Sequence, residues 1–225
     1  MAVASPQSVK LPVVRLPVWR RPGFWAALVG VAVVGLVGAR VVTRTTESAP
    51  PVKREELPVL STVPAFSFVS QDGKAFESKS MAGKIWVANF IFTRCPNICP
   101  KFTAKMGSLQ DKSATAMPSL QLVSFTVDPE HDTPEVLRAY GEKHRADFAR
   151  WTFARGERAE LEKVIKEGML QPMDMGDGVD LNSVVHGSYF ALIDGQLKVR
   201  GVYRFTDAGS VDDMLRDAQV LALSR

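Results

Sequence analysis

Two cysteines four residues apart are the most chemically informative feature of the sequence. Cys95 and Cys99 lie in the stretch TRCPNICPK and are the only two cysteines of the chain. Two thiols at this spacing can clamp a metal ion, form a redox-active dithiol or close a structural disulfide. A disulfide here would close a very short loop and would constrain the unfolded chain little. The spacing therefore favours a functional dithiol.

The residues around the cysteines predict a reactive site. An apolar run over 84–92 predicts a buried strand, and Pro96 suits the first turn of a helix that follows it. Positions i and i+4 share one face of a helix, so both sulfurs can point the same way. The helix N-terminus, Arg94 and Lys101 supply positive charge, which lowers the pKa of a thiol. We therefore expect thiolate character, and this disfavours the alternative of two buried, unreactive cysteines.

Strand-like and helix-like segments alternate from residue 64 onward. Strands are predicted as a hairpin over 64–76, as single strands over 84–92, 120–128 and 151–154, and as a second hairpin over 188–205. Helices are predicted after Cys95, from Thr133, over 157–170 and over 211–223. This order predicts an α/β domain with a mixed central sheet and helices on both faces. A thioredoxin-like fold matches it best.

The position of His186 distinguishes this site from a simple redox dithiol. Thioredoxin-type redox enzymes use Cys-x-x-Cys and place a cis-proline opposite the dithiol, before the strand that follows the third helix. Here three residues separate the cysteines, the last proline is Pro172, and His186 stands at the corresponding place. Two thiolates and an imidazole suit copper, because thiolates favour Cu(I) and imidazole also accepts Cu(II).

Three segments, in order, resemble the Sco (SenC/PrrC) family of membrane-anchored copper proteins. They read FIFTRCPNICP, SFTVDPEHDTPEVLRAYGEKH and VVHGSYFALIDGQLKVRGVY. The resemblance implies that Cys95, Cys99 and His186 bind copper, as Cu(I) or Cu(II). It also implies a role in delivering copper to, or preparing, the binuclear copper site of cytochrome c oxidase.

Two positions depart from the pattern of that family. Many members have Asp inside the Cys-x-x-x-Cys segment and Asp immediately before the histidine, where this chain has Asn97 and Val185. Both changes remove negative charge near the site. We therefore expect docking to an oxidase subunit, or the hydrogen bonding that tunes His186, to differ.

An uncharged stretch near the N-terminus predicts one transmembrane helix. Residues 23–39 span about 26 Å at 1.5 Å per residue, and extension to residue 42 brings them to a bilayer core of about 30 Å. A cleaved signal peptide would have a shorter apolar core, so an uncleaved anchor is favoured. A long following domain translocates largely regardless of flanking charge, which favours the N-terminus inside. The expected organisation is a cytoplasmic tail over 1–22, an anchor over 23–42, a linker over 43–60 and a thioredoxin-like copper-binding domain over 61–225.

The basic character of the chain lies mainly in its N-terminal part. The formal net charge is +4, whereas residues 58–225 carry 20 Lys and Arg against 21 Asp and Glu, a charge of −1. No basic stripe interleaved with aromatic residues occurs there. Nucleic-acid binding is therefore excluded as a function.

Two further histidines are weaker candidates for metal binding. His131 lies in a loop after a predicted buried strand, near the functional edge of the sheet. It is a candidate auxiliary ligand, although a solvated loop histidine is the simpler interpretation. His144 lies in a polar run and is expected at the surface.

Three methionines offer a second kind of soft ligand. Met169, Met173 and Met175 form a candidate thioether patch for transient capture of Cu(I), against the simpler interpretation that Met169 packs in the core and the other two lie in a loop. The neighbouring acidic residues lack the alternate spacing of an EF-hand loop; they are Asp174, Asp177 and Asp180.

The favoured function is that of a copper metallochaperone, a binding protein without turnover. The alternative is a thiol–disulfide oxidoreductase that acts on client cysteines through Cys95 and Cys99, and a copper- or redox-responsive sensor is a third class. His186 separates the first two, because a simple dithiol exchanger does not need it. The expected partners are the copper-site subunit of cytochrome c oxidase or another copper chaperone, and the membrane. The expected location is the bacterial inner (cytoplasmic) membrane, with the C-terminal domain in the periplasm.

Overall fold

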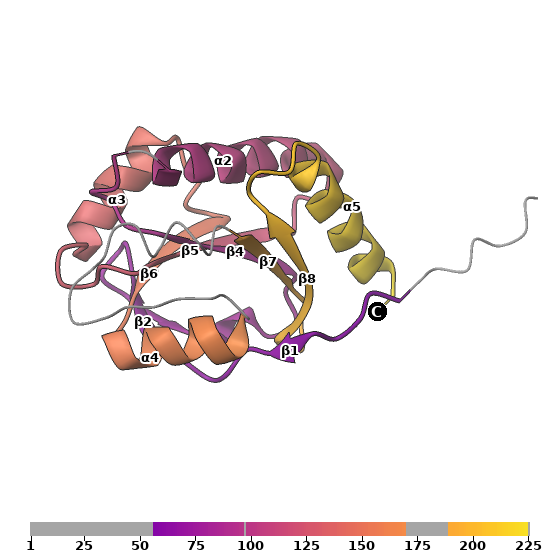
Figure 1. Cartoon of the computed structure of the whole chain (residues 1–225), viewed down its shortest axis with the longest axis horizontal. Helices are drawn as coiled ribbons and strands as arrows, with labels where there is room; N and C mark the ends of the chain where they lie inside the picture. The colour runs from indigo at the N-terminus through magenta and orange to yellow at the C-terminus, as the bar shows by residue number, and fades with distance from the viewer. Residues whose placement is uncertain (1–55, 97, 170–188, 225) are drawn as a thin grey trace, which may run out of the picture. The chain divides into compact units, whose positions relative to one another are not determined.

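A mixed β-sheet forms the centre of the domain in the computed structural model, which describes residues 56–96, 98–169 and 189–224 (Figure 1). Within these residues the sheet has eight strands in the order β1-β8-β7-β4-β5-β6-β2-β3. The strands are β1 (Ser61–Thr62), β2 (Ser67–Ser70), β3 (Ala75–Glu77), β4 (Trp86–Ile91), β5 (Gln121–Thr126), β6 (Trp151–Arg155), β7 (Tyr189–Ile193) and β8 (Lys198–Arg204). Strands β4, β5 and β6 are parallel, and the other pairings are antiparallel.

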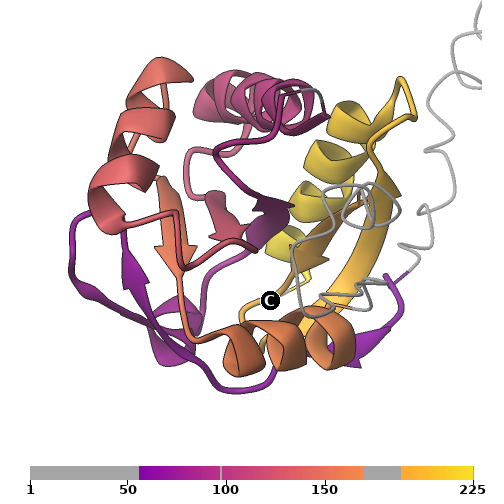
Figure 2. The same ribbon diagram turned by 60° about the vertical axis from the view of Figure 1, so that its left-hand side comes forward.

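Helices cover both faces of the sheet, as Figures 1 and 2 show. Helices α2, α3 and α5 lie on one face, and α4 with its π-helical extension η3 lies on the other. Their bounds are α2 (Ile98–Ala116), α3 (Pro134–Lys143), α4 (Arg158–Lys163), η3 (Val164–Gly168) and α5 (Ser210–Leu223), with a short 3-10 helix η2 (Ser78–Met81) after β3. Each face buries its own apolar cluster. The layers are those of the thioredoxin-like α/β fold that the sequence predicts.

Local sequence explains the central elements. Every residue of β4 is buried, because this strand has helices on both faces, and its side chains alternate between the two clusters. Helix α3 begins as its sequence predicts, with Pro134 in the first turn and the Thr133 hydroxyl accepting a hydrogen bond from the Val136 N–H at 3.4 Å. The turn between β2 and β3 contains Gly73 at φ 70°, a conformation that favours glycine.

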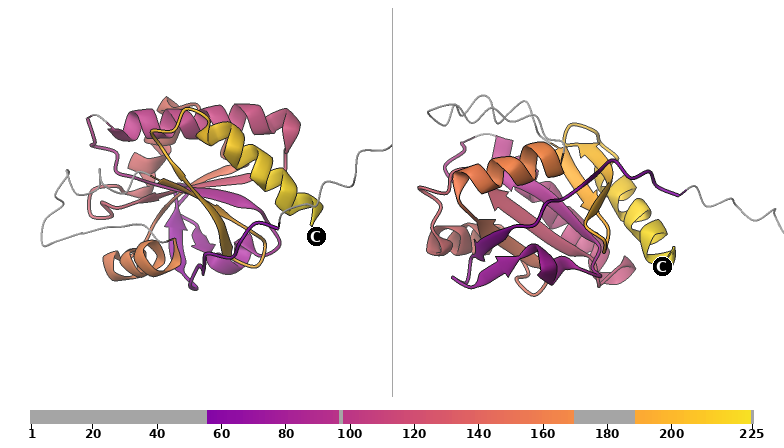
Figure 3. Two further views of the ribbon diagram at one scale, coloured as in Figure 1. Left: turned by 45° about the vertical axis from the view of Figure 1, so that its right-hand side comes forward. Right: turned by 90° about the horizontal axis from the view of Figure 1, so that it is seen from below.

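The parallel strands bring two connecting segments together at one edge of the sheet (Figure 3). Ile91 of β4 and Thr126 of β5 are register partners at the carboxyl ends of their strands. The Val127 N–H still donates to the Ile91 carbonyl at 2.8 Å. The turn after β4 and the loop after β5 therefore leave the sheet side by side, and the first of these carries Cys95.

The chain joins the sheet earlier than the sequence predicts. Leu57, expected in the linker, packs against the apolar cluster on the α2 face. The Leu60 N–H donates to the Val199 carbonyl at 2.8 Å, and β1 follows directly. The Arg200 Nε donates to the carbonyl oxygens of Leu57 and Pro58 at 3.1 and 3.2 Å. These contacts are long-range, so no local sequence pattern indicates them.

The predicted membrane anchor over 23–42 lies outside the described residues. Among the residues that the structure does describe, no helix has the length and hydropathy needed to cross a membrane.

A truncation series tests the contribution of residues 57–60. We expect a chain of residues 54–225 to unfold cooperatively, and a chain of residues 61–225 to be less stable by about 2 kcal/mol, because hydrogen bonds to a charged group contribute about 1.5–3 kcal/mol. Urea unfolding followed by circular dichroism measures both. With Arg200→Ala in each chain, the truncation should cost clearly less. Equal stability of the two unsubstituted chains would show that these contacts contribute nothing.

Candidate metal centre

The two cysteines lie together at the junction between β4 and α2. Cys95 is in the turn after β4, where its N–H donates to the Phe92 carbonyl at 3.2 Å. Cys99 is in the first turn of α2, and its N–H donates to the Cys95 Sγ at 3.4 Å. Both cysteines are buried, with 8% of the surface of Cys95 and 2% of the surface of Cys99 exposed. The Cys95 sulfur thus occupies the place of a capping group at the helix start.

Burial changes the acid–base behaviour that the sequence predicts. The pKa of the Cys99 thiol rises from 9.0 to about 12, first because burial penalises the thiolate, and further because of Cys95 and Asp132, while a backbone hydrogen bond with Phe92 acts in the opposite direction. The prediction that the helix N-terminus and nearby cations lower this pKa is wrong for Cys99. Desolvation outweighs a partial charge that falls off within the first turn.

The cation next to Cys95 is already paired. The Arg94 Nε donates to the Asp128 Oδ2 at 2.7 Å, and Asp128 is 2% exposed. The positive charge of Arg94 is therefore largely neutralised locally and does little to favour a thiolate. Lys101, the other predicted cation, is exposed to solvent.

A loop after β5 contributes two buried carboxylates that the sequence interpretation missed. Possible ligand atoms of Asp128, His131 and Asp132 lie within 4.8 Å of one another. The carboxylates already accept hydrogen bonds from Arg94 and from the hydroxyl groups of Thr93 and Thr126. The imidazole Nδ1 of His131 lies 3.1 Å from the Asp132 Oδ1. Asp128, His131 and Asp132 therefore form a hydrogen-bonded cluster of side chains beside the cysteines.

The other weak candidates have ordinary structural roles where they are described. Met169 is fully buried in the same apolar cluster as Cys95 and Cys99, as the core interpretation predicts. His144 is half-buried with its ring 4.5 Å from that of Tyr140, and burial lowers its pKa. The expectation of a surface histidine is therefore only partly correct.

Several predicted site residues lie outside the described part of the chain. These are Asn97, Met173, Met175, Val185 and His186, together with the three aspartates near them, Asp174, Asp177 and Asp180. The convergence of His186 on the two sulfurs stays a prediction.

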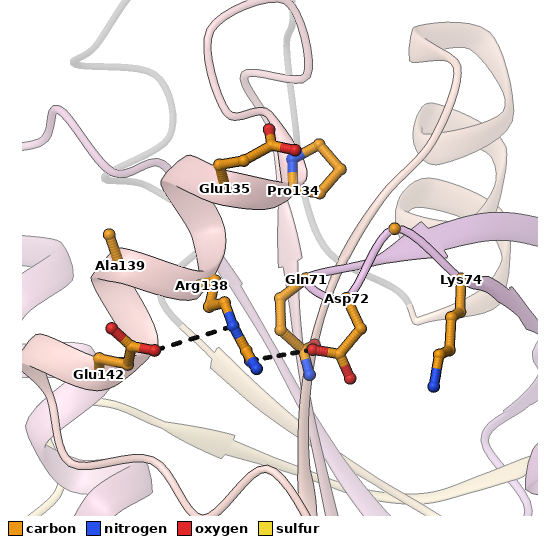
Figure 4. A pocket seen from close by; sticks show the side chains of 9 residues that line it. Gln71, Asp72, Lys74, Pro134, Glu135, Arg138, Ala139 and Glu142 are labelled. Atoms are coloured by element: carbon orange, nitrogen blue, oxygen red, sulfur yellow. Dashed lines mark hydrogen bonds and ion pairs between the residues drawn. The ribbon is translucent and has the colours of Figure 1, made fainter.

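A separate concave surface lies between α3 and the β2–β3 turn (Figure 4). Its volume is about 550 Å³, and its lining is largely charged. Arg138 extends between Asp72 and Glu142, at 3.0 and 3.8 Å. These charges satisfy one another, and this surface contains no thiol or imidazole, so the dithiol is the candidate site.

Fold and site together define a thioredoxin-like domain with a buried dithiol spaced as Cys-x-x-x-Cys. The model of the SCO1/SenC family matches residues 55–221. The chain belongs to this family, which confirms the resemblance inferred from its motifs.

Individual relatives agree with this assignment. The SCO1 protein homolog of Bacillus subtilis (strain 168) is 33% identical over 163 residues, which are 72% of this chain and 83% of that protein. The structure of BsSco, a member of the Sco family of cytochrome c oxidase assembly proteins, is 32% identical, with a TM-score of 0.67 over 75% of this chain and 97% of BsSco. Yeast Sco1, solved with copper bound, is 24% identical, with a TM-score of 0.57 over 72% of this chain and 94% of that structure. At 24% identity, the likeness to yeast Sco1 shows the fold alone.

Alkylation of the reduced protein tests the raised pKa of Cys99. Iodoacetamide reacts with the thiolate, and at pH 8 a pKa of about 12 in place of 9.0 lowers the thiolate fraction by about 10³. We expect Cys99 in the native protein to be labelled at least about 100-fold more slowly than Cys99 in urea, and labelling to accelerate as pH rises. Peptide mapping by mass spectrometry separates the two cysteines. Equal rates in native buffer and urea would contradict the raised pKa.

Proposed function

We propose that the chain is a copper-binding protein of cytochrome c oxidase assembly, which holds copper through Cys95, Cys99 and His186 and delivers it to, or prepares, the binuclear copper site of the oxidase. The observation that carries the proposal is the pair of buried cysteines at the start of α2, in which the Cys99 N–H donates to the Cys95 Sγ. The chemistry of the donors fits, because soft thiolates are the preferred ligands of Cu(I).

The apolar surroundings of the sulfurs suit a cargo site. A thiol buried at a pKa of about 12 stays protonated and unreactive near neutral pH. Cu(I) displaces thiol protons to solvent when it binds, so the thiolates form together with their metal bonds. An imidazole from His186 would complete a site with two sulfurs and one nitrogen and would extend it to Cu(II).

Relatives support both parts of the proposal, which are copper binding and a role in the assembly of cytochrome c oxidase. BsSco is described as a member of a family of cytochrome c oxidase assembly proteins, and it covers 75% of this chain at 32% identity. Yeast Sco1, which shares the fold, was solved with copper bound. The two cysteines at the junction between β4 and α2 are the residues of this chain through which such a role would act.

Thiol–disulfide exchange is the less favoured alternative. The rate of exchange depends on the thiolate fraction of the attacking cysteine and on access to it. Cys99 is 2% exposed and its pKa is raised, and Cys95 is 8% exposed. Both properties slow attack on a disulfide in a client protein.

The proposed location is the periplasmic side of the bacterial inner membrane. An anchor over 23–42 would hold the domain there through the linker that follows it. The support for this proposal is the length of the uncharged stretch, which is close to that of a bilayer core.

Replacement of His186 separates copper binding from dithiol chemistry. We expect His186→Ala to weaken Cu(II) binding by more than about 100-fold, because the loss of a mere hydrogen-bond partner of a ligand already costs 10–100-fold. Cu(I) binding should suffer less, since two thiolates can hold Cu(I) alone. The variant should also fail to support oxidase assembly in cells. Competition against a chelator and the sulfur-to-copper absorption of the loaded protein measure the binding.

His144→Ala is the matched control for His186→Ala. This histidine caps the C-terminal end of α3, where its ring packs against that of Tyr140. It should bind copper as the unsubstituted protein does. Undiminished oxidase assembly in His186→Ala, with Cys95→Ser inactive, would contradict the copper proposal and favour exchange.

A further inference from the structure

The turn that carries Cys95 is fastened to a single buried carboxylate. Thr93, two residues before Cys95, donates its N–H to the Asp132 Oδ2 at 3.1 Å and its hydroxyl to the Asp132 Oδ1 at 2.5 Å. These two bonds link residues 39 apart in the sequence. Together they fix both the backbone and the side chain of Thr93, because two bonds to one planar carboxylate define an orientation as well as a distance.

The carboxylate is itself held in place by its loop. Asp132 is fully buried, and its Oδ2 also accepts from the Thr126 hydroxyl at 2.5 Å. Its N–H donates to the Asp128 carbonyl at 2.9 Å. The side chain of Asp128 in turn binds Arg94 at 2.7 Å. The two residues that precede Cys95 are thus both bound by carboxylates of one loop, which is anchored at the end of β5.

Burial of the Asp132 carboxylate is costly unless hydrogen bonds compensate for the lost hydration. Two of the four side-chain contacts of Asp132 go to Thr93, beside the dithiol, and the other two go to Thr126 and His131. From Thr93 the constraint passes along the chain to Cys95, whose N–H is bound to Phe92 and whose sulfur accepts the Cys99 N–H. The carboxylate is therefore connected to the Cys95 sulfur through the hydrogen bonds of Thr93 and the short backbone segment from Thr93 to Cys95.

We propose that Asp132 is a positioning residue that holds the Cys95 turn in the geometry of copper capture before the metal arrives. This inference rests on the proposed copper function. Without the carboxylate, the turn would sample several orientations and would have to be ordered when copper binds. That ordering would subtract from the affinity.

The test compares two substitutions at one position. Asp132→Ala removes all the side-chain bonds to Thr93. Asp132→Asn keeps the shape, since the amide oxygen can accept from the Thr93 N–H and the amide nitrogen can donate to the Thr93 hydroxyl. We expect Asp132→Ala to weaken Cu(I) binding by about 10–100-fold and to change the sulfur-to-copper absorption of the Cu(II) form. Asp132→Asn should restore most of the affinity.

Electrostatics alone predicts the opposite result. The charge of Asp132 contributes to the raised pKa of Cys99, so its removal favours the thiolate. Tighter copper binding in Asp132→Ala would therefore overturn the inference.

Asp194→Ala provides a matched control for Asp132→Ala. Asp194 is a buried aspartate that accepts from the Gln196 and Lys198 N–H groups at 2.8 and 3.0 Å and so organises the β7–β8 turn. Its neighbour Ile193 pairs with Trp86, at the opposite end of β4 from Cys95. Asp194→Ala should lower the melting temperature to an extent comparable with Asp132→Ala but leave copper affinity within about threefold. Equal losses of affinity in the two variants would show a general effect of stability and would contradict the inference.

Amide hydrogen exchange of the metal-free full-length chain supplies a readout that does not depend on copper. A peptide covering residues 92–99 should exchange faster in Asp132→Ala than in the unsubstituted protein, Asp132→Asn or Asp194→Ala. Unchanged exchange there would overturn the inference even if the proposed function holds. Absence of copper binding by the unsubstituted protein would instead overturn the proposed function.

If Asp132→Ala does not fold, Thr93→Val replaces it. This substitution removes one of the two bonds to Asp132 and keeps the carboxylate, so exchange at 92–99 should still accelerate and copper affinity should fall severalfold. No change in either measurement would contradict the positioning role.

Discussion

The hydrogen bonds of the buried Asp132 carboxylate join the parts of the domain on which the site depends. They connect the loop before α3 with the end of β5, six residues away, and with the turn after β4, 39 residues away in the sequence. The parallel pairing of β4 with β5 makes this possible, because Ile91 and Thr126 end their strands in register. A hydrogen-bonded carboxylate between the two exits then orients the turn that leads into α2.

Two opposing effects, the helix dipole and apolar burial, act on the charge of the cysteines at the start of α2. The N–H of Cys99 points at the Cys95 sulfur, which is the favourable end of the helix dipole for a negative charge. Apolar burial around both thiols acts against that charge and dominates for Cys99. The result is a Cys99 thiol that stays protonated near neutral pH without a metal, next to the sulfur of Cys95. Such a site suits storage and transfer of a soft cation better than rapid attack on disulfides.

Much of the fold follows from local sequence. The apolar run of β4, the Thr133-Pro134 start of α3 and the glycine turn at Gly73 each have a local physical cause, and the structure contains all three. The Cys-x-x-x-Cys spacing likewise identifies the dithiol without structural information. Local reasoning fails where distant segments meet. The role of Asp128 and Asp132 depends on contacts 34 and 39 residues away, although their position in a loop after a buried strand was a usable signal. The pKa of Cys99 was predicted in the wrong direction because its burial, and the pairing of Arg94 with Asp128, exist only in the folded domain.

X-ray absorption spectroscopy of the protein loaded with one equivalent of Cu(I) tests the central claim most directly. Two thiolates at the start of α2 and an imidazole from His186 predict a first coordination shell of two sulfurs and one nitrogen, with the outer-shell scattering that a histidine ring produces. Loss of that imidazole scattering in His186→Ala, with both sulfurs retained, would identify the nitrogen. A shell without sulfur, or one sulfur with several light atoms in the unsubstituted protein, would contradict copper binding by Cys95 and Cys99 together.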